Sequence, residues 1–277
     1  MAERHPESGN KIRVGVIFGG RSGEHEVSLM SARSVMAALD EEKYDVVPIG
    51  IDREGQWLVG DAMRALSDGA AEAAQPATLL PAPHSAGLVQ LERRPEEASA
   101  PPQPLSLSRV TELDVIIPVL HGPYGEDGTV QGLLELAGLP YVGAGVTGSA
   151  VGMDKAIFKQ VMVANEIPVL PWVLVKASEW RSHPDLVVEK IEAALSYPVF
   201  AKPANLGSSV GISRCTDRDS LIAGLDEAAR FDRRLVVEQG IDGRELEVAV
   251  LGNDAPIASI VGEIRPRRAF YDYVAKY

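Results

Sequence analysis

The stretch FAKPANLGSSVGISR, from Phe200 to Arg214, combines a lysine in an apolar segment with a loop of small residues. Lys202 follows the apolar PVFA, and a lysine on a buried face needs an anionic partner. In the following GSSVG, small residues let the backbone approach a ligand closely, and Ser208 and Ser209 add hydroxyl donors. The stretch therefore indicates a site for an anion.

A second lysine, Lys155 in MDKAIF, stands at the start of an expected helix. Either lysine alone is explained by a solvated ammonium group on a flexible stem. Together, Lys155, Lys202 and the serine loop favour a polyphosphate ligand. The strand-like VVEQGI adds a backbone edge that can bind a purine, with Glu238 near it and Glu245 spaced to follow on the next strand.

Two polar loops follow expected strands in the first half of the chain. GGRSGEHEVS contains Glu24, His25, Glu26 and Ser28, and VLHGPYGEDGT contains His121, Glu126 and Asp127. Taken singly, the first loop is explained by a capped helix start and the second by a structural histidine. Loops at the carboxyl ends of parallel strands are where such folds bind ligands, so two of them favour a shared pocket.

Two common phosphate-binding signatures do not account for the site. The pattern G-x-x-x-x-G-K-[ST] is absent from the sequence. G-x-G-x-x-G occurs at Gly143–Gly148, but it follows only the short PYV rather than a full strand. A glycine-rich hinge is the better explanation of that segment.

The elements that position these residues follow from hydrophobic periodicity. In the first half we expect strands at 12–20, 44–51 and 113–120 and helices at 28–39 and 129–138, which predicts a parallel sheet flanked by helices. Residues 60–109 are rich in Ala, Pro, Ser and Glu and predict a variable insertion with at most short strands, such as GLVQL at 87–91. In the second half we expect helices at 154–166, 184–195 and 218–231, strands at 172–175, 198–204, 212–215 and 234–241, and an antiparallel pattern at 244–253.

Composition limits the kind of partner. The chain has 277 residues, 45% of them apolar, with a net charge of −12 and a sequence pI near 4.9. This balance argues against nucleic acid or an anionic membrane as the main partner. Cys215 is the single cysteine, so no internal disulfide framework is possible. No signal-like segment or run of roughly 18 apolar residues occurs, and a cytoplasmic protein is the default expectation.

Four segments carry a resemblance to a known family. GGRSGEHEVSLMSA, LHGPYGEDGTVQGLLELAGLPYVGAGVTGSAVGMDK, KPANLGSSVGIS and FYDYVAKY occur in order and resemble the D-alanine–D-alanine ligases of the ATP-grasp superfamily. The resemblance implies an α/β protein with three parts. These are a Rossmann-like parallel-sheet domain at 1–152, with the low-complexity insertion at 60–109, a central α+β subdomain at 153–241, and an incomplete C-terminal antiparallel α+β subdomain at 242–277.

The resemblance also implies a reaction and substrate contacts. The family uses ATP to phosphorylate one D-alanine carboxylate, which the amine of a second D-alanine attacks, giving the dipeptide for peptidoglycan. Glu24 would bind the ammonium group of the first D-alanine, with His121 beside that substrate. Ser208 and Tyr277 would complete a hydrogen-bonded triad with Glu24, and Lys276 belongs to the same closing loop. Relatives that make D-alanyl-D-lactate tend to have phenylalanine at this position, so Tyr277 favours an amine as second substrate.

The ATP contacts implied by the resemblance lie in the second half. Lys155 and Lys202 would bind the phosphates, which Ser208 and Ser209 would cover. Glu238 and the backbones of Gln239 and Ile241 would bind the adenine, and Glu245 would bind the ribose.

The chain departs from the family at its end, because the family pattern continues well past Tyr277. The Mg²⁺ or Mn²⁺ ligands are expected beyond residue 277, and a chain without them is expected to be inactive or nearly so. The family is commonly dimeric, so a homodimer is expected. Two alternatives stay open: another ATP-dependent carboxylate–amine or depsipeptide ligase, and a nucleotide-binding remnant without catalysis.

Overall fold

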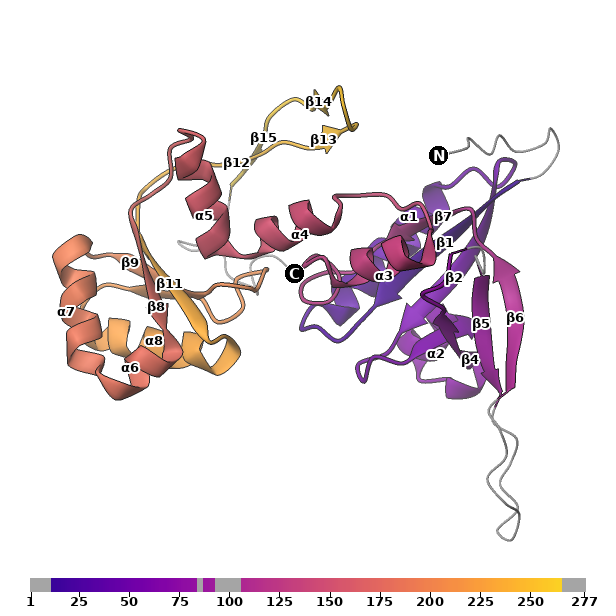
Figure 1. Cartoon of the computed structure of the whole chain (residues 1–277), viewed down its shortest axis with the longest axis horizontal. Helices are drawn as coiled ribbons and strands as arrows, with labels where there is room; N and C mark the ends of the chain where they lie inside the picture. Colours follow the sequence, from indigo (N-terminus) through magenta and orange to yellow (C-terminus); the bar gives the residue numbers. More distant parts are fainter. Residues whose placement is uncertain (1–10, 84–86, 93–105, 266–277) are drawn as a thin grey trace, which may run out of the picture. The chain divides into compact units, whose positions relative to one another are not determined.

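The computed structural model describes residues 11–83, 87–92 and 106–265. The chain divides into two compact units, Met1–Asp154 and Lys155–Tyr277 (Figure 1). Each unit has its own sheet and its own buried core. The domain boundaries after residues 152 and 241 that the family resemblance implies stay predictions.

A seven-stranded sheet in the order β6-β5-β4-β3-β2-β1-β7 forms the first unit. Its parallel part consists of β1 (Ile12–Gly19), β2 (Tyr44–Ile51) and β7 (Val115–Pro118). β2 pairs antiparallel with β3 (Trp57–Gly60), and the pairs beyond β3 are antiparallel as well. The expectation of a parallel sheet is therefore wrong for β3 to β6, which pair antiparallel. The sheet is mixed because a short loop after β2 turns the chain straight back, as only antiparallel neighbours allow.

The proline-rich segment 60–109 contains more secondary structure than its composition suggests. It holds α2 (Ala62–Asp68), a short 3-10 helix (Ala71–Ala73), β4 (Ala74–Leu79), β5 (Gly87–Glu92) and the start of β6 (Ser106–Glu112). Leu79 and Leu88 are buried in one cluster with Ile17 and Ile116 of the parallel strands. Burying a large apolar side chain contributes about 1.5–3 kcal/mol, which explains why this segment joins the sheet.

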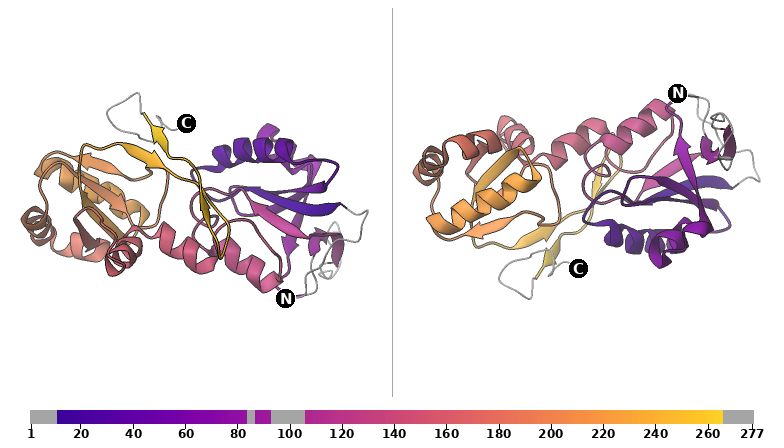
Figure 2. Two further views of the ribbon diagram at one scale, coloured as in Figure 1. Left: turned by 90° about the horizontal axis from the view of Figure 1, so that it is seen from above. Right: turned by 90° about the horizontal axis from the view of Figure 1, so that it is seen from below.

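Helices cover both faces of this sheet (Figure 2). On one face, α1 (His25–Ala38) buries Leu29 and Ala32. On the other, α3 (Thr129–Ala137) buries Val130 and Leu134 and ends at Gly138, whose φ of +66° places it in the left-handed region. The expected helix at 129–138 is confirmed, and α1 begins three residues before the expected start at Ser28.

The glycine-rich segment after α3 opens a helix that the sequence pattern did not predict. Tyr141 makes a single parallel bridge to Ile116 of β7, and Gly145 is the N-cap of α4 (Val146–Met153). The glycines thus follow one bridge rather than a full strand, which is the context that made a dinucleotide site a weak interpretation.

The second unit is built on an antiparallel sheet in the order β10-β9-β11-β8. Its strands are β8 (Trp172–Lys176), β9 (Val199–Pro203), β10 (Ser213–Cys215) and β11 (Arg234–Gln239), and its helices are α5 (Lys155–Ala164), α6 (Ala177–Ser182), α7 (Pro184–Ala194) and α8 (Arg218–Phe231). The expected strands and the three expected helices are all present. Asp217 is the N-cap of α8 and forms a capping box. The Asp217 carboxylate accepts from the Ser220 N–H, and the Ser220 hydroxyl accepts from the Asp217 N–H.

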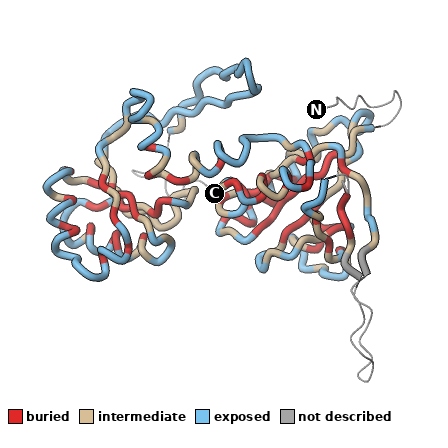
Figure 3. The backbone as a smooth tube through the Cα atoms, viewed as in Figure 1, coloured by how far each residue is buried: buried red, intermediate tan, exposed pale blue. Residues whose placement is uncertain are grey.

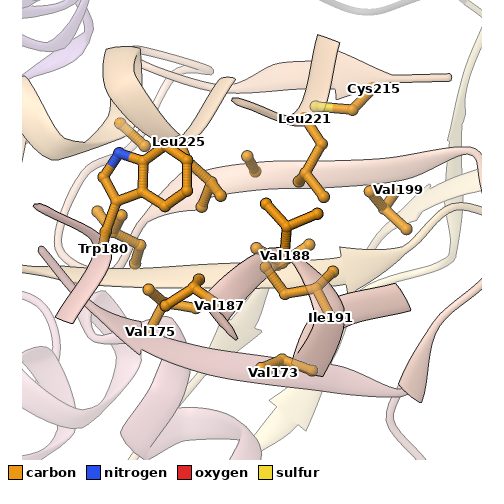
Figure 4. Packing of buried hydrophobic residues seen from close by; sticks show 14 of the residues in the cluster. Val173, Val175, Trp180, Val187, Val188, Ile191, Val199, Cys215, Leu221 and Leu225 are labelled. Atoms are coloured by element: carbon orange, nitrogen blue, oxygen red, sulfur yellow. The ribbon is translucent and has the colours of Figure 1, made fainter. Parts of the chain in front are cut away.

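One face of this sheet packs against α6, α7 and α8. The cluster contains Val175 and Val199 from the strands, Ile191 from α7, and Leu221 and Leu225 from α8, all at or below 1% exposure (Figure 4). Because side chains alternate along a strand, the neighbouring residues Phe200, Lys202 and Glu238 lie on the opposite face. That opposite face carries the candidate site described below.

The last described part of the chain forms two short antiparallel pairs. β12 (Glu245–Glu247) pairs with β15 (Gly262–Ile264), and β13 (Val250–Leu251) pairs with β14 (Ile257–Ala258). The expected antiparallel pattern is confirmed. Residues 241–263 are exposed throughout, in contrast to the buried strands of the two sheets (Figure 3).

Candidate active site

In the first unit the turn between β1 and α1 requires glycine. Gly19 has a φ of +89°, and a Cβ there would lie 2.2 Å from the backbone oxygen of Ile51. The N–H of Gly19 donates to Oγ of Ser28 at 2.8 Å, and the N–H of Gly20 donates to the oxygen of Ile51 at 2.8 Å. These bonds direct the chain from the end of β1 into α1.

The first turns of α1 contact the loop that follows β7. Ser28 Oγ donates to the backbone oxygen of Val119, and Ser31 Oγ lies 3.1 Å from Nε2 of His121. Glu24 is 5% exposed, and a Cβ on Gly122 would lie 2.9 Å from its Oε2, so the carboxylate lies against the Gly122 backbone. The two polar loops therefore meet at the carboxyl ends of β1 and β7, as expected for a shared pocket.

The acidic residues that follow His121 stabilise the loop itself. Glu126 Oε2 accepts from the N–H of Gly122 at 2.7 Å, and Asp127 accepts from the N–H groups of Tyr124 and Thr129. Gln131 Nε2 donates to the oxygen of Gly125 at 2.8 Å. These bonds give the loop a fixed shape, and the buried Glu24 carboxylate lies against its Gly122 backbone.

A cavity of about 210 Å³ opens next to His121 in the same unit. Its walls are mostly apolar and include Trp57, Leu120 and Tyr124, with Arg21 stacked over the Tyr124 ring at 5.2 Å. Glu24 is not among the residues that line it. The cavity is therefore lined by His121 but not by the Glu24 carboxylate.

In the second unit, three charged side chains meet on the sheet face opposite the main core. Glu238 on β11 accepts from Lys202 on β9 through Oε2 and forms an ion pair with Lys159 on α5 through Oε1. The side chains of Lys159, Lys202 and Glu238 are 11%, 19% and 12% exposed. Burial raises the pKa of Glu238, but the Lys202 and Lys159 ammonium groups outweigh it and hold that pKa below its usual value.

The serine loop of the second unit has an unusual backbone. Ser208 and Ser209 have φ values of +48° and +61°, in the left-handed region that non-glycine residues rarely adopt. Gly211 follows at +66°, and a Cβ there would lie 2.7 Å from Cδ2 of Phe231. Such backbone strain clusters at ligand-binding sites, so the loop geometry supports the anion site that its sequence indicated.

The other residues expected to contact ATP lie in the second unit. Lys155 Nζ donates to the backbone oxygens of Ala204 and Leu206, at the start of the serine loop. Gln239 ends β11, and its backbone N–H donates to the oxygen of Pro171 at 2.9 Å. Ile241 is exposed after β11, and Glu245 is exposed at the start of β12.

Two family models match the chain. One, described as D-ala D-ala ligase N-terminus, matches residues 13–144, and the other, D-ala D-ala ligase C-terminus, matches residues 161–277. The D-alanine–D-alanine ligase of Heliobacterium modesticaldum is 49% identical over 268 residues, which cover 96% of this chain and 70% of that protein. The chain belongs to the D-alanine–D-alanine ligase family.

Other members of the family agree in sequence and in fold. The D-alanine–D-alanine ligase of Natranaerobius thermophilus is 47% identical over 269 residues, covering 96% of this chain and 70% of the relative. The solved VanG D-Ala:D-Ser ligase of Enterococcus faecalis superposes with a TM-score of 0.79 at 35% identity, covering 97% of this chain and 74% of that one. The Coxiella burnetii D-alanine–D-alanine ligase superposes at 0.74, with 35% identity and coverage of 92% and 68%.

Within this ligase, the structure brings the expected site residues together in two groups. The loops that carry Glu24 and His121 meet in the first unit, and Lys202 meets Glu238 in the second. Glu24 and Ser208 belong to different units, and Lys276 and Tyr277 lie outside the described residues. The Glu24–Ser208–Tyr277 triad and the closing loop therefore stay predictions.

Sequence reasoning missed two residues of these groups. Lys159 stands one helical turn after Lys155, and this i, i+4 spacing on a predicted helix was the signal that could have found it. Ser31 lies in the first turn of the expected helix at 28–39, seven residues after Glu24 in the preceding loop, and this position was the signal that could have found it. In both cases the partner, Glu238 or His121, lies on another element and is not apparent from local sequence.

No group of three or more His, Cys, Asp or Glu side chains within residues 11–83, 87–92 and 106–265 is placed to hold a metal ion. No helix in the same ranges is long and apolar enough to cross a membrane.

Proposed function

We propose that this ligase joins two D-alanine molecules to D-alanyl-D-alanine with hydrolysis of ATP to ADP and phosphate, for peptidoglycan synthesis. The observation that carries the proposal is the 49% identity to a D-alanine–D-alanine ligase over 96% of the chain. The two groups of polar residues support it: a buried carboxylate beside a histidine suits an amino acid, and a lysine-lined sheet face suits a nucleotide.

The proposed reaction has two steps. An oxygen of the first D-alanine carboxylate attacks the γ-phosphorus of ATP, and ADP leaves. The amine of the second D-alanine then attacks the resulting acyl phosphate, the C–N bond forms, phosphate leaves and the amine loses a proton. Charge develops on transferring oxygens in both steps, so aimed ammonium and N–H groups supply most of the stabilisation that the chain itself can give.

In the first unit, Glu24 binds the ammonium group of the first D-alanine. A carboxylate that is 5% exposed forms a stronger charge-assisted contact than a solvated one, because water does not compete for it. His121, which Ser31 orients, lies beside this substrate. Ser208 and Tyr277 complete the triad with Glu24, and the segment with Lys276 closes over the substrates. Tyr277 favours an amine as the second substrate.

In the second unit, the sheet face and the serine loop bind ATP in an ATP-grasp arrangement. Lys155 and Lys202 contact the phosphates, with Ser208 and Ser209 above them. The remaining contacts are to the base and the sugar, with Glu238 and the backbones of Gln239 and Ile241 at the adenine and Glu245 at the ribose. Central and C-terminal parts at 153–241 and 242–277 would enclose the nucleotide.

Mg²⁺ or Mn²⁺ accompanies ATP in this family, and the described residues do not fit a site for it, since they contain no suitable group of ligands. We assign no step to the metal and propose that its ligands lie beyond residue 277. A homodimer and a cytoplasmic location are proposed on the family resemblance.

The test measures D-alanine-dependent phosphate release from ATP by the natural protein, together with the dipeptide product. Release of one phosphate per dipeptide formed is expected. D-serine and D-lactate are offered as second substrates in parallel, because the VanG D-Ala:D-Ser ligase is a structural relative. If a product forms only with D-serine or D-lactate, that compound replaces D-alanine as the proposed second substrate. ATP binding without phosphate release would instead indicate a nucleotide-binding protein.

A further inference from the structure

Lys159 is a buried lysine that the proposed reaction leaves without a role. The residue is 9% exposed as a whole, and its ammonium group pairs with Oε1 of Glu238. A lysine is rarely buried unless it is paired, because removing its charge from water is costly. The pairing with Glu238 explains how Lys159 is tolerated there, and it raises the question of what the pair does.

The helix that carries Lys159 is fixed on the sheet. Ala156 of α5 is fully buried in a cluster with Ala204 and Val236. One turn of helix separates Lys155 from Lys159, so both project from the same side of α5 toward this face. Lys155 reaches the backbone oxygens before the serine loop, and Lys159 reaches β11.

Glu238 lies between two lysines of different exposure. In the sheet it stands in register with Trp172 of β8 and Phe200 of β9, so aromatic side chains flank it. Its Oε1 goes to Lys159 and its Oε2 to Lys202. The Lys202 side chain is the more exposed of the two, and its ammonium lies 5.5 Å from the centre of the Phe200 ring. Lys202 is therefore the partner that an incoming ligand can displace more easily.

We propose that Lys159 is a positioning residue of the nucleotide site. It holds Oε1 of Glu238, so that Oε2 can exchange Lys202 for an N–H donor of the purine base while Lys202 turns to the phosphates. The proposal rests on the proposed function, since it specifies how the ATP site is assembled. With two ammonium groups to one carboxylate, Glu238 keeps a partner throughout the exchange.

Removal of Lys159 has a specific consequence. In Lys159→Met, Lys202 becomes the only described lysine paired with Glu238, so releasing it to the phosphates would leave the half-buried carboxylate without a cation. Binding of ATP then weakens, whereas the chemistry of a bound ATP does not change. We expect the KM for ATP to rise roughly tenfold and kcat at saturating ATP to stay within about threefold.

The experiment compares five variants of the natural protein with the wild type. Lys159→Met and Lys159→Arg are assayed for KM and kcat with ATP, and binding of a fluorescent ATP analogue is measured directly. Lys176→Met is the matched control, because Lys176 is exposed in the same unit and pairs with Glu179 at 3.5 Å. Glu238→Gln is combined with Lys159→Met to test whether the lysine acts through the carboxylate.

Each outcome decides a different point. We expect Lys159→Arg to keep most of the ATP affinity, Lys176→Met to match the wild type, and Lys159→Met to have no further effect on KM in the Glu238→Gln background. Unchanged ATP affinity in a folded Lys159→Met variant, or an equal loss in both backgrounds, would overturn the proposal. If the wild type itself binds no nucleotide, the proposed function fails instead. Should Lys159→Met not fold, Lys159→Gln, which also lacks the ammonium group, is compared in the two backgrounds instead.

Discussion

The Oγ of Ser31 lies 3.1 Å from Nε2 of His121, which joins α1 to the loop after β7 across 90 positions of sequence. Ser28 and Glu24 contact the same loop from the preceding turns of α1. One helix face therefore sets the position of the histidine that we place beside the first D-alanine. This relationship makes Ser31 a direct test of the site in the first unit.

Replacing Ser31 by alanine should raise the KM for the first D-alanine about three- to tenfold. The hydrogen bond is part-buried, and losing such a bond costs about 0.5–1.5 kcal/mol. Steady-state kinetics that vary D-alanine at saturating ATP measure the effect. Ser34→Ala is the control, since Ser34 is exposed on α1 and bonds only within the helix, to the Met30 oxygen. Equal effects of the two variants would contradict the positioning of His121 by Ser31.

Gly122→Ala should impair both stability and D-alanine binding. Gly122 has a φ of +76°, and its Cβ would lie 2.9 Å from Glu24 Oε2, so the substitution strains the backbone and displaces the carboxylate. The backbone cost alone is about 1–2 kcal/mol. Chemical denaturation and kcat/KM for D-alanine measure the two effects.

Gly132→Ala is the matched control for Gly122. Gly132 lies within α3, and nothing stands within 4 Å of its added Cβ. This change should stabilise the protein by about 0.5–1 kcal/mol and leave the kinetics unaltered. Loss of D-alanine affinity in Gly132→Ala as large as in Gly122→Ala would show that the loop does not act through Glu24.

The ion pairs of Glu238 should make stability depend on pH in the acid range. The pKa of Glu238 lies below its usual 4.5 in the folded protein, so its contribution is present above that pH and is lost as pH falls through the folded-state value. Glu238→Gln should be less stable by about 2–4 kcal/mol at pH 7, because the largely buried Lys159 and Lys202 lose their carboxylate partner.

Fluorescence-detected urea unfolding of the second unit, which contains Trp172 and Trp180, provides the measurement. The difference between wild type and Glu238→Gln should be constant from pH 7 down to about 4.5 and should narrow below it. A difference that stays the same at pH 3 would rule out the charged pair as its source.

The contribution of Tyr197 to stability should be lost at alkaline pH rather than at acid pH. Burial, then the 2.9 Å hydrogen bond to Glu192, raises its pKa from 10.0 to about 12. Since the folded state favours the protonated phenol, the stabilisation is complete below pH 10 and is lost as pH rises through about 12.

Tyr197→Phe tests this point. The variant should lose about 1 kcal/mol at neutral pH, and its difference from the wild type should shrink above pH 10. Ultraviolet titration of the folded wild type should show a tyrosine that ionises near pH 12 and is missing from the variant. Retention of that late step in Tyr197→Phe would assign it to another tyrosine.

Local sequence was sufficient for most elements and for the nature of the site. The helix at 218–231 was predicted with its observed bounds, because Asp217 and the apolar period mark its start and its buried face. From residue types alone, the polar loops after β1 and β7 predicted a shared pocket and the serine loop predicted a polyphosphate site, whereas the amino acid substrate was implied only by the family resemblance. These features depend on residues that are close in sequence, where spacing alone sets which side chains share a face.

Tertiary structure decided which distant residues meet. The Ala- and Pro-rich composition of segment 60–109 hid strands that extend the sheet, because strand pairing depends on burial of Leu79 and Leu88 against Ile17 rather than on local propensity. Local sequence does not distinguish Lys159 from a solvent-exposed helix lysine or Ser31 from a surface serine. The fold pairs Lys159 with Glu238 of β11 and places Ser31 within hydrogen-bond distance of His121 after β7. A pairing between elements depends on the packing of the whole unit, so the sequence determined the chemistry available to this protein and only the fold determined which groups act together.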